Sequence, residues 1–275
     1  MLIAPLWEAA RPRQWIKNLF VFAPAVFGLR LHQPPIMLQV GLTFMSFCLA
    51  SSASYLLNDV VDRHKDRDNP RTCRRPVARG ALSPHLALVA SGMFALAALV
   101  LSWFPGVALP VVVYLLTTGL YSLLLKKVPL LDVLSLAGLY QLRLWAGALA
   151  ASVPPSPWLL TCGGFLALTL ATGKRLETNR SLYPRALLRV ALDSLLVLTA
   201  VSYLAYTVSR GPAHQLPHWF LLSLLPALAG LWRYRTLALR GLADPSEALF
   251  RDRLLQVAAV GWLALVLALA ASGLQ

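Results

Sequence analysis

The chain contains one apolar run after another, each long enough to cross a lipid bilayer. A transmembrane helix needs roughly 20 predominantly apolar residues. The 275-residue chain is 58% hydrophobic and only 13% charged, with a mean hydropathy of +0.65, which excludes an ordinary soluble domain. The sequence predicts an all-α polytopic membrane protein, a single integral membrane domain over residues 1–275 with nine transmembrane helices. Their expected positions are 14–31, 36–57, 85–104, 107–125, 129–150, 157–173, 186–209, 217–239 and 254–272.

The distribution of positive charge predicts the topology. Short cytoplasmic loops of membrane proteins are rich in Lys and Arg. With nine spans and a cytoplasmic amino terminus, all 25 Lys and Arg residues fall in cytoplasmic segments except Arg30, Arg143 and Arg210. The Asp and Glu residues fall on the same side. We therefore expect a multi-pass protein of the inner (cytoplasmic) membrane whose amino terminus and active site face the cytoplasm.

An acidic cluster follows the second apolar run, where residues 58–68 read Asn-Asp-Val-Val-Asp-Arg-His-Lys-Asp-Arg-Asp. On one helix Asp59, Asp62 and Asp66 are spaced i, i+3, i+7 and share a face, and Asn58 lies four residues before Asp62. Mg²⁺ binds one or two carboxylates and completes its shell with substrate phosphates. We expect these three aspartates to be the metal ligands and catalytic residues, in a cytoplasmic catalytic loop over about 58–84.

Seven basic residues lie between and after the acidic positions within the same short segment. Guanidinium groups match the geometry of phosphate oxygens, so carboxylates and arginines side by side indicate phosphate chemistry. The alternative is a solvated polar loop after a membrane helix, and the density of basic residues favours the functional interpretation. The basic residues are Arg63, Lys65, Arg67, Arg71, Arg74, Arg75 and Arg79.

Two further groups of charged residues lie near the inner ends of expected spans. Asp132 and Arg143 are eleven residues apart, about three helical turns, and so lie on one face. They form either an internal salt bridge or a contact to a phosphate or lipid headgroup, because an arginine at that depth needs a partner or a cavity. Lys174 and Arg175 open a second cytoplasmic loop at about 173–186, where topological anchoring and substrate binding are equally compatible with the sequence.

The net charge of +14 does not indicate a nucleic-acid partner. Basic loops against anionic lipid headgroups, together with anionic substrates, account for it. The interleaved basic and aromatic pattern of a nucleic-acid module is absent from the sequence. We expect membrane lipids as partners and leave the oligomeric state open, a homo-oligomer included.

In order and spacing these motifs resemble the UbiA superfamily of intramembrane prenyltransferases. The closer similarity is to the branch that transfers phosphoribose to a polyprenyl phosphate, and it covers nearly the whole chain. Each motif is weak alone, whereas the set in this order is specific. The motifs are Arg11-Pro12-Arg13-Gln14-Trp15-Ile16-Lys17-Asn18, Asn58-Asp59-x-x-Asp62-x-x-x-Asp66, Arg75-Pro76-Val77-Ala78-Arg79-Gly80, Val128-Pro129-Leu130-Leu131-Asp132, Gly173-Lys174-Arg175, Arg233-Tyr234-Arg235 and Asp244-Pro245.

The resemblance implies nine helices around a central cavity and an Mg²⁺-dependent transfer, with Mn²⁺ as a substitute. The implied donor is 5-phosphoribosyl 1-diphosphate and the implied acceptor is a polyprenyl phosphate, in a step that supplies a pentose donor for arabinan or other cell-envelope glycans. Asp59, Asp62 and Asp66 would hold the metal. The implied substrate-binding residues are Lys17, Asn58, Arg67, Arg75, Lys127, Asp132, Arg143, Lys174 and Arg175.

The chain departs from the pattern of that branch at two positions. Asn69 stands where a His usually precedes the proline, and Thr72 stands where a Lys is usual. The aromatic prenyltransferases of the superfamily carry a second Asp-rich motif after the sixth helix, whereas residues 173–180 of this chain contain one acid. This difference favours the phosphoribosyl branch. A polyprenyltransferase acting on an aromatic ring and a lipid or solute transporter remain the alternatives.

Overall fold

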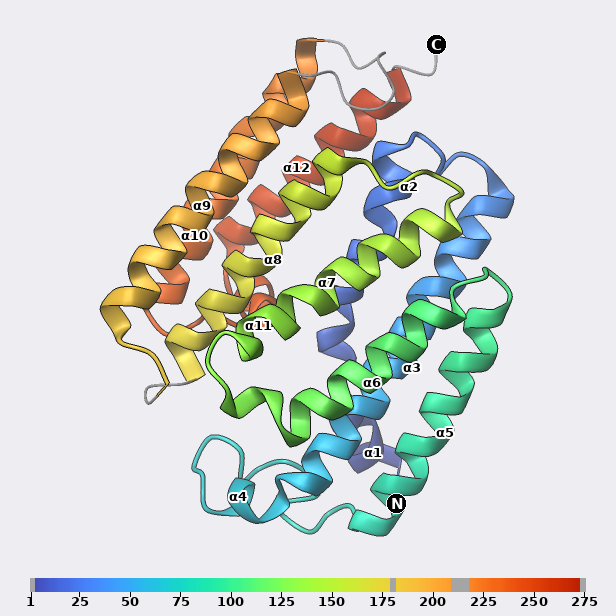
Figure 1. Cartoon of the computed structure of the whole chain (residues 1–275), viewed down its shortest axis with the longest axis vertical. Coiled ribbons are helices and arrows are strands. Elements are labelled where there is room, and N and C mark those ends of the chain that lie inside the picture. Colours follow the sequence, from blue (N-terminus) through green and yellow to red (C-terminus); the bar gives the residue numbers. More distant parts are fainter. Residues whose placement is uncertain (1–2, 179–181, 209–217, 273–275) are drawn as a thin grey trace.

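The computed structural model describes residues 3–178, 182–208 and 218–272, and all regular elements in these ranges are helices (Figure 1). The all-α prediction is confirmed. Arg210 and residues 179–181 of the second expected loop lie outside the described ranges. The α-helices are α1 (Ile3–Ala10), α2 (Ala23–Phe27), α3 (Pro34–Val61), α4 (Arg63–Arg67), α5 (Pro84–Trp103), α6 (Ala108–Leu123), α7 (Leu131–Ala150), α8 (Pro157–Thr178), α9 (Arg185–Val208), α10 (Leu224–Leu239), α11 (Pro245–Arg251) and α12 (Arg253–Ser272), and the 3₁₀ helices are η1 (Pro12–Phe22), η2 (Leu125–Lys127) and η3 (His218–Ser223).

Prolines mark the starts of several helices. Pro34, Pro84, Pro157 and Pro245 are the first residues of α3, α5, α8 and α11. Proline suits this position because its missing amide hydrogen would have no helical partner there and its φ is already helical. Before α5, the Ser83 side chain accepts a hydrogen bond from the Leu86 amide and completes the cap.

Each expected span coincides with a helix or a pair of helices, but nine spans are not confirmed. Among the described residues, four helices are long and apolar enough to cross a membrane: α3, α5, α7 and α9. A fifth is counted if α11 and α12, bent by 101°, form one broken span. The first expected span is divided into η1 and α2 because Pro24 cannot donate a helical hydrogen bond. The central cavity stays a prediction.

Buried packing centres on α3. This helix packs against α5, α6, α7 and η1, while α8 packs against α7 and α9, and α10 against α12. Small polar residues let α3 approach its neighbours. The hydroxyls of Thr43 and Ser46, both fully buried, donate to the carbonyls of Gln39 and Leu42 four residues earlier. Such back-bonding satisfies a hydroxyl without water, as a membrane helix requires.

The polar connections gather at one end of the bundle. Figure 1 shows α1, α4, the end of α3 and the end of α8 toward the lower edge of the view, with the loop after α4 beside them. The outer surface elsewhere is apolar: on α5, Met93 is 65% exposed and Leu96 is 64% exposed. A large apolar exposure of this kind suits contact with lipid. Most of the charged side chains therefore lie at one end of the bundle.

Gly147 on α7 sets how closely this helix approaches η1. A Cβ at Gly147 would lie 2.0 Å from the backbone oxygen of Val21, which cannot move aside as a side chain can. We expect Gly147→Ala to destabilise the fold by about 1–3 kcal/mol, measured by thermal unfolding in detergent. Gly138→Ala is the matched control on the same helix, since no atom lies within 4 Å of its added methyl group. Equal losses in both variants would contradict the close contact as the cause.

Candidate active site

The acidic cluster is divided between two helices. α3 ends at Val61, and Asp62, with φ −89° and ψ 4°, separates it from α4. The expectation that the three aspartates share one continuous helical face is therefore wrong. Asp62 makes no side-chain cap hydrogen bond to the start of α4, and its carboxylate instead contacts Lys126. Backbone bonds still cross the turn, from the Asp62 amide to the Asn58 carbonyl at 2.9 Å and from the Asp66 amide to the Asp62 carbonyl at 2.8 Å.

Arg75 connects two of the three carboxylates. Its Nη1 lies 2.7 Å from Asp66 Oδ2 and 3.4 Å from Asp59 Oδ1. Arg11 forms a second ion pair with Asp59. Asp59 is 1% exposed and Asp66 is 6% exposed, so both charges depend on these guanidinium groups for compensation. We call Asp59, Asp62, Asp66, Arg11 and Arg75 the acidic centre.

Asp62 has a different cation. Lys126 Nζ, from η2, lies 2.8 Å from Asp62 Oδ1 and 2.7 Å from Asp62 Oδ2. The turn between α3 and α4 thus directs Asp62 toward the end of α6. Both side chains of this pair are about one-fifth exposed, so the pair is accessible to solvent and to a ligand.

The donor set of the acidic centre suits a divalent cation of the Mg²⁺ type, because it offers oxygen ligands only. Asp59 Oδ2 is buried and has no hydrogen-bond partner, which leaves one oxygen free to bind a cation. Within the described ranges, however, no three His, Cys, Asp or Glu side chains lie together closely enough to hold an ion. The assignment of all three aspartates as metal ligands stays a prediction.

The turn after α4 contains both departures from the phosphoribosyl branch. Asn69 Oδ1 accepts a hydrogen bond from the Arg71 amide at 3.0 Å. The Thr72 hydroxyl donates to the Asp66 carbonyl at 3.3 Å. Asn and Thr form such local turns readily. In this chain these two positions shape the loop that presents Arg75 to the carboxylates. Arg67 also serves the loop, because its Nε donates to the Ala78 carbonyl at 2.9 Å.

Asp132 pairs with Arg175 and not with Arg143. Arg175 Nε lies 2.7 Å from Asp132 Oδ2, and both side chains are almost completely buried. Tyr183 donates a hydrogen bond to the other oxygen of Asp132, and Arg175 donates to the Tyr121 hydroxyl. The internal salt bridge considered for Asp132 thus exists, but its cation comes from α8, a helix that continues to Thr178, past the expected start of the second loop.

Arg143 lies deep in the bundle in a cage of aromatic and polar groups. Its Nε donates to Asn18 Oδ1 at 2.7 Å, its Nη1 to the Leu139 carbonyl at 2.6 Å and its Nη2 to the Tyr114 hydroxyl at 3.1 Å. The guanidinium carbon also lies 4.8 Å from the centre of the Tyr114 ring. Cation–π contact and three hydrogen bonds compensate a charge that the apolar interior would otherwise disfavour.

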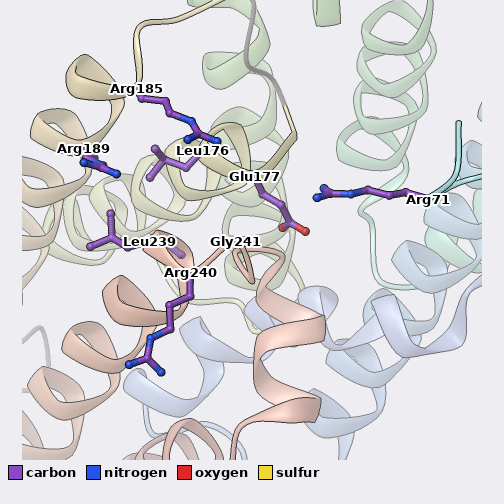
Figure 2. Close-up of a pocket in the computed structure, with 9 residues that line it drawn as sticks. Arg71, Leu176, Glu177, Arg185, Arg189, Leu239, Arg240 and Gly241 are labelled. Atoms are coloured by element: carbon purple, nitrogen blue, oxygen red, sulfur yellow. The ribbon is translucent and has the colours of Figure 1, made fainter.

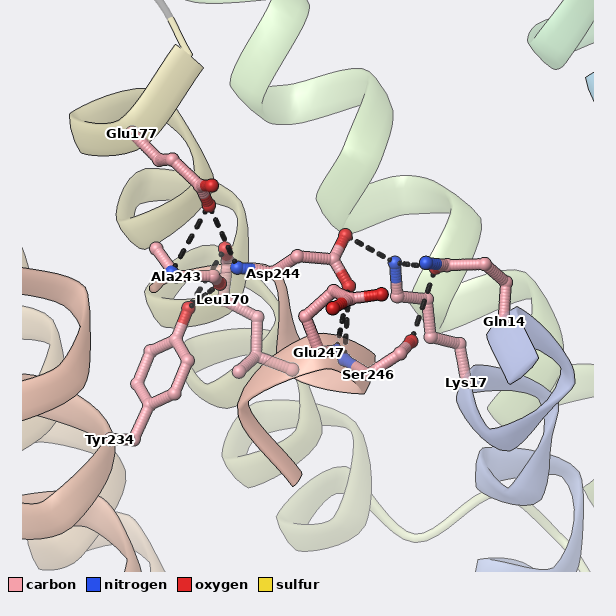
Figure 3. Close-up of polar contacts among 9 residues, drawn as sticks. All are labelled: Gln14, Lys17, Leu170, Glu177, Tyr234, Ala243, Asp244, Ser246 and Glu247. Carbon is pink, nitrogen blue, oxygen red and sulfur yellow. Dashed lines mark hydrogen bonds and ion pairs between the residues drawn. The ribbon is translucent and has the colours of Figure 1, made fainter. Parts of the chain in front are cut away.

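Another ion pair joins a segment near the amino terminus to one near the carboxyl terminus (Figure 3). Lys17 Nζ on η1 lies 2.8 Å from Asp244 Oδ2, although the two residues are 227 positions apart in the sequence. Burial raises the pKa of the Asp244 carboxyl, but Lys17 and Lys174 lower it more, so its pKa lies well below the usual range. Asp244 is consequently ionised at neutral pH. Lys174 thus lies near the Lys17–Asp244 pair.

Glu177 at the end of α8 holds the segment that carries Asp244. Its Oε2 accepts hydrogen bonds from the Ala243 and Asp244 amides, each at 3.1 Å. The Tyr234 hydroxyl donates to the Ala243 carbonyl at 2.9 Å, and Figure 3 shows both contacts on this segment. A Cβ at Gly173 would lie 2.4 Å from the Tyr234 hydroxyl oxygen, so this close approach requires glycine.

The structure therefore groups some predicted site residues and separates others. Asp59, Asp66 and Arg75 meet directly, as do Asp132 and Arg175, while Arg143 lies in a separate cage. Sequence reasoning did not assign Arg11, Lys126 or Asp244 to the site. Arg11 and Asp244 both belong to motifs of the resemblance, which was the available signal. Lys126 had no signal beyond its charge. For all nine predicted substrate-binding residues, Asn58 and Lys127 included, that role stays a prediction.

A bundle of apolar helices with carboxylates and arginines gathered at one end is the arrangement of an integral membrane protein that handles anionic groups. The model of the UbiA prenyltransferase family matches residues 19–256, and the chain belongs to this family of integral membrane proteins. The resemblance seen in the sequence is confirmed.

Two mycobacterial relatives are similar along nearly their full lengths. The decaprenyl-phosphate phosphoribosyltransferase of Mycobacterium tuberculosis is 32% identical over 99% of this chain and 96% of its own. The protein of the same name from Mycolicibacterium smegmatis is 31% identical over 95% of this chain and 91% of its own.

Solved structures show the same fold. A UbiA homolog from Archaeoglobus fulgidus, bound to DMAPP and Mg²⁺, has a TM-score of 0.65 and 16% identity over 98% of this chain and 97% of that chain. A UbiA homolog from Aeropyrum pernix has a TM-score of 0.64 and 16% identity over 100% of this chain and 98% of that chain. The UbiA-like fold expected from the sequence is confirmed.

Proposed function

We propose that this protein transfers the 5-phosphoribosyl group of 5-phosphoribosyl 1-diphosphate to a polyprenyl phosphate and releases diphosphate. The observation that carries the proposal is the acidic centre, where Arg75 contacts both Asp59 and Asp66. It lies in a chain 32% identical, over 99% of its length, to a decaprenyl-phosphate phosphoribosyltransferase. The arginines can donate hydrogen bonds to the oxygens of a bound diphosphate, and the carboxylates can bind a divalent cation.

Asp59, Asp62 and Asp66 would hold Mg²⁺, with Mn²⁺ as a substitute, and Asp59 Oδ2 is the oxygen best placed to accept it. When bound, the cation neutralises the negative charge that grows on the leaving diphosphate. Arg11 and Arg75 already lie against Asp59, so they are placed to bind the phosphates of the same ligand. Bidentate arginine contacts to phosphate are both strong and directional.

Two anionic substrates must be held together against their mutual repulsion. Lys17 and Lys174, near Asp244, and Arg175, beside Asp132, provide positive charge next to the acidic end of the bundle. We assign Lys174 and Arg175 to the 5-phosphate of the donor, and Lys17 to holding the phosphates of donor and acceptor close together. We assign Arg143, which lies inside the bundle, to the lipid acceptor or to turnover. The other proposed substrate-binding residues are Asn58, Arg67, Arg75, Lys127 and Asp132.

The chemistry needs no general base. The bond between the anomeric carbon and the diphosphate oxygen breaks with its electron pair on the diphosphate, and a phosphate oxygen of the acceptor forms the new bond to that carbon. The acceptor is already an anion at neutral pH, so no proton has to be removed. This agrees with a centre composed of carboxylates and cations without a histidine among them.

The proposed reaction takes place at the cytoplasmic face of the cytoplasmic membrane. The distribution of Lys and Arg supports this orientation, because basic loops stay on the cytoplasmic side. The product would supply a pentose donor for cell-envelope glycans such as arabinan.

The test uses the purified protein in detergent with pairs of donor and acceptor. We expect diphosphate release with 5-phosphoribosyl 1-diphosphate and a polyprenyl phosphate in the presence of Mg²⁺. EDTA should abolish the reaction, and Mg²⁺ or Mn²⁺ should restore it, whereas Zn²⁺ should not, because the site offers oxygen ligands only. Ribosyl 1-diphosphate without the 5-phosphate should be a poor donor.

Two outcomes would contradict the proposal. Activity only with isoprenyl diphosphates and an aromatic acceptor would identify an aromatic prenyltransferase instead. The absence of diphosphate release with every pair would favour a transporter.

A further inference from the structure

Four arginines line a hollow outside the acidic centre. The hollow has a volume of about 240 Å³ and lies where the loop after α4 meets the ends of α8, α9 and α10 (Figure 2). Figure 2 shows the side chains of Arg71 and Glu177 extending toward each other, Arg185 and Arg189 of α9 across from them, and the guanidinium group of Arg240 turned away from the other three. Leu176 and Leu239 supply apolar wall. We call this hollow the four-arginine pocket.

The described parts of the chain provide no partner for these four guanidinium groups. No ion pair or hydrogen bond involves the side chain of Arg71, Arg185, Arg189 or Arg240, although nine other basic residues are in ion pairs. Glu177 is the one carboxylate among the lining residues, and it already accepts the Ala243 and Asp244 amides. The pocket therefore has a large excess of positive charge.

Helix electrostatics do not explain the two arginines on α9. Arg185 and Arg189 occupy the first and fifth positions of that helix. The amino-terminal end of a helix carries partial positive charge, so cations are disfavoured there. The two residues also have an i, i+4 spacing, at which like charges repel. An anion in the pocket would reverse both effects. Arg240, at the carboxyl-terminal cap of α10, is in a position that the helix dipole favours by itself.

We propose that the four-arginine pocket binds a phosphate group. Its volume is below the roughly 300–1,000 Å³ of typical small-molecule sites, so it accommodates a phosphate-bearing head and not a whole lipid or nucleotide. Arginine forks match phosphate oxygens in geometry and charge. The phosphate comes either from the headgroup of an anionic phospholipid or from a small soluble phosphate. The proposal does not rest on the transfer reaction, because none of the lining residues belongs to the acidic centre.

The soluble source is tested with inorganic phosphate. Calorimetric titration of the purified full-length protein in detergent, at constant ionic strength, should show binding to the wild type. Arg189→Gln and, separately, Arg240→Gln should raise the Kd about tenfold or more, as the loss of a charge-assisted hydrogen bond implies. Arg253→Gln is the matched control, because Arg253 is likewise an exposed arginine at the start of a helix, α12, but does not line the pocket. The Kd of this control variant for inorganic phosphate should equal that of the wild type.

The lipid source is tested with phosphatidic acid. Native mass spectrometry of the protein, after mixing with micelles that contain phosphatidic acid and phosphatidylcholine, should show retained phosphatidic acid that the two pocket variants lose and Arg253→Gln keeps. Loss of either ligand in the pocket variants alone supports the proposal and identifies the source. Binding that is absent in the wild type for both probes, or unchanged in the pocket variants, or equally lowered by Arg253→Gln, overturns it. Neither measurement includes donor or acceptor, so a failure of the proposed transferase reaction would leave these results unaffected.

Discussion

Asp62→Asn is expected to lower turnover by about a hundredfold or more, the loss seen when a group that stabilises developing charge is removed. The fold should be retained. The Asp62 side chain is 22% exposed and its ion pair with Lys126 is accessible to solvent, and such pairs contribute only about 0–1 kcal/mol to stability. The measurement is diphosphate release at saturating substrates, followed over a titration of Mg²⁺, together with thermal unfolding.

Lys126→Gln is the matched control for this prediction. It removes the same ion pair from the other side, because Lys126 Nζ contacts both oxygens of Asp62. If Asp62 acts through a metal, Lys126→Gln should affect turnover far less than Asp62→Asn and should not raise the Mg²⁺ requirement. Equal losses in the two variants would show that Asp62 acts only through the ion pair.

Arg175→Ala should destabilise the protein by about 3–5 kcal/mol, because it leaves the carboxylate of Asp132 buried without its cation. Asp132 has 0% side-chain exposure and Arg175 has 7%, and their Nε–Oδ2 distance is 2.7 Å. Activity should fall as well, since we assign Arg175 to phosphate binding. The measurements are thermal unfolding in detergent and the KM of the donor.

The double variant Asp132→Asn with Arg175→Gln separates stability from binding. It removes both charges, so no uncompensated charge stays in the interior and most of the lost stability should return. The donor KM should remain about tenfold or more above that of the wild type, as expected for a lost charge-assisted contact. Recovery of the donor KM along with stability would make Arg175 a structural residue and contradict its assignment to the donor.

The position of the acidic cluster was predicted from the sequence, but its internal arrangement was not. The residue types and their place after a long apolar run identify Asp59, Asp62 and Asp66 as unusual in a membrane chain. Helical periodicity placed them on one face, whereas the backbone turns at Asp62 and sends it to Lys126. Local spacing predicts a shared face only while the helix continues, and the propensity of a single Asp to end a helix is a weak signal.

The spans show the same limit. Apolar length correctly placed helices along the chain, because burying backbone polar groups in lipid leaves helices as the only open-chain solution. It did not reveal that the first segment divides into η1 and α2 between Phe22 and Ala23, nor that α11 meets α12 at 101°. Hydropathy is averaged over a window of residues, so it does not detect a change of helix type or a bend at a single position.

The sequence by itself determined that this protein is helical, lies in a membrane and concentrates carboxylates and arginines in a few connecting segments, since hydropathy and residue chemistry are properties of the chain before it folds. Only the tertiary structure decided which charges meet. Lys17 pairs with Asp244 across 227 positions, Asp132 pairs with Arg175 instead of Arg143, and four arginines from three segments line one hollow. The reason is that an ion pair forms only when the nitrogen and oxygen come within about 4 Å, and helix packing, not sequence spacing, sets which side chains come within that distance.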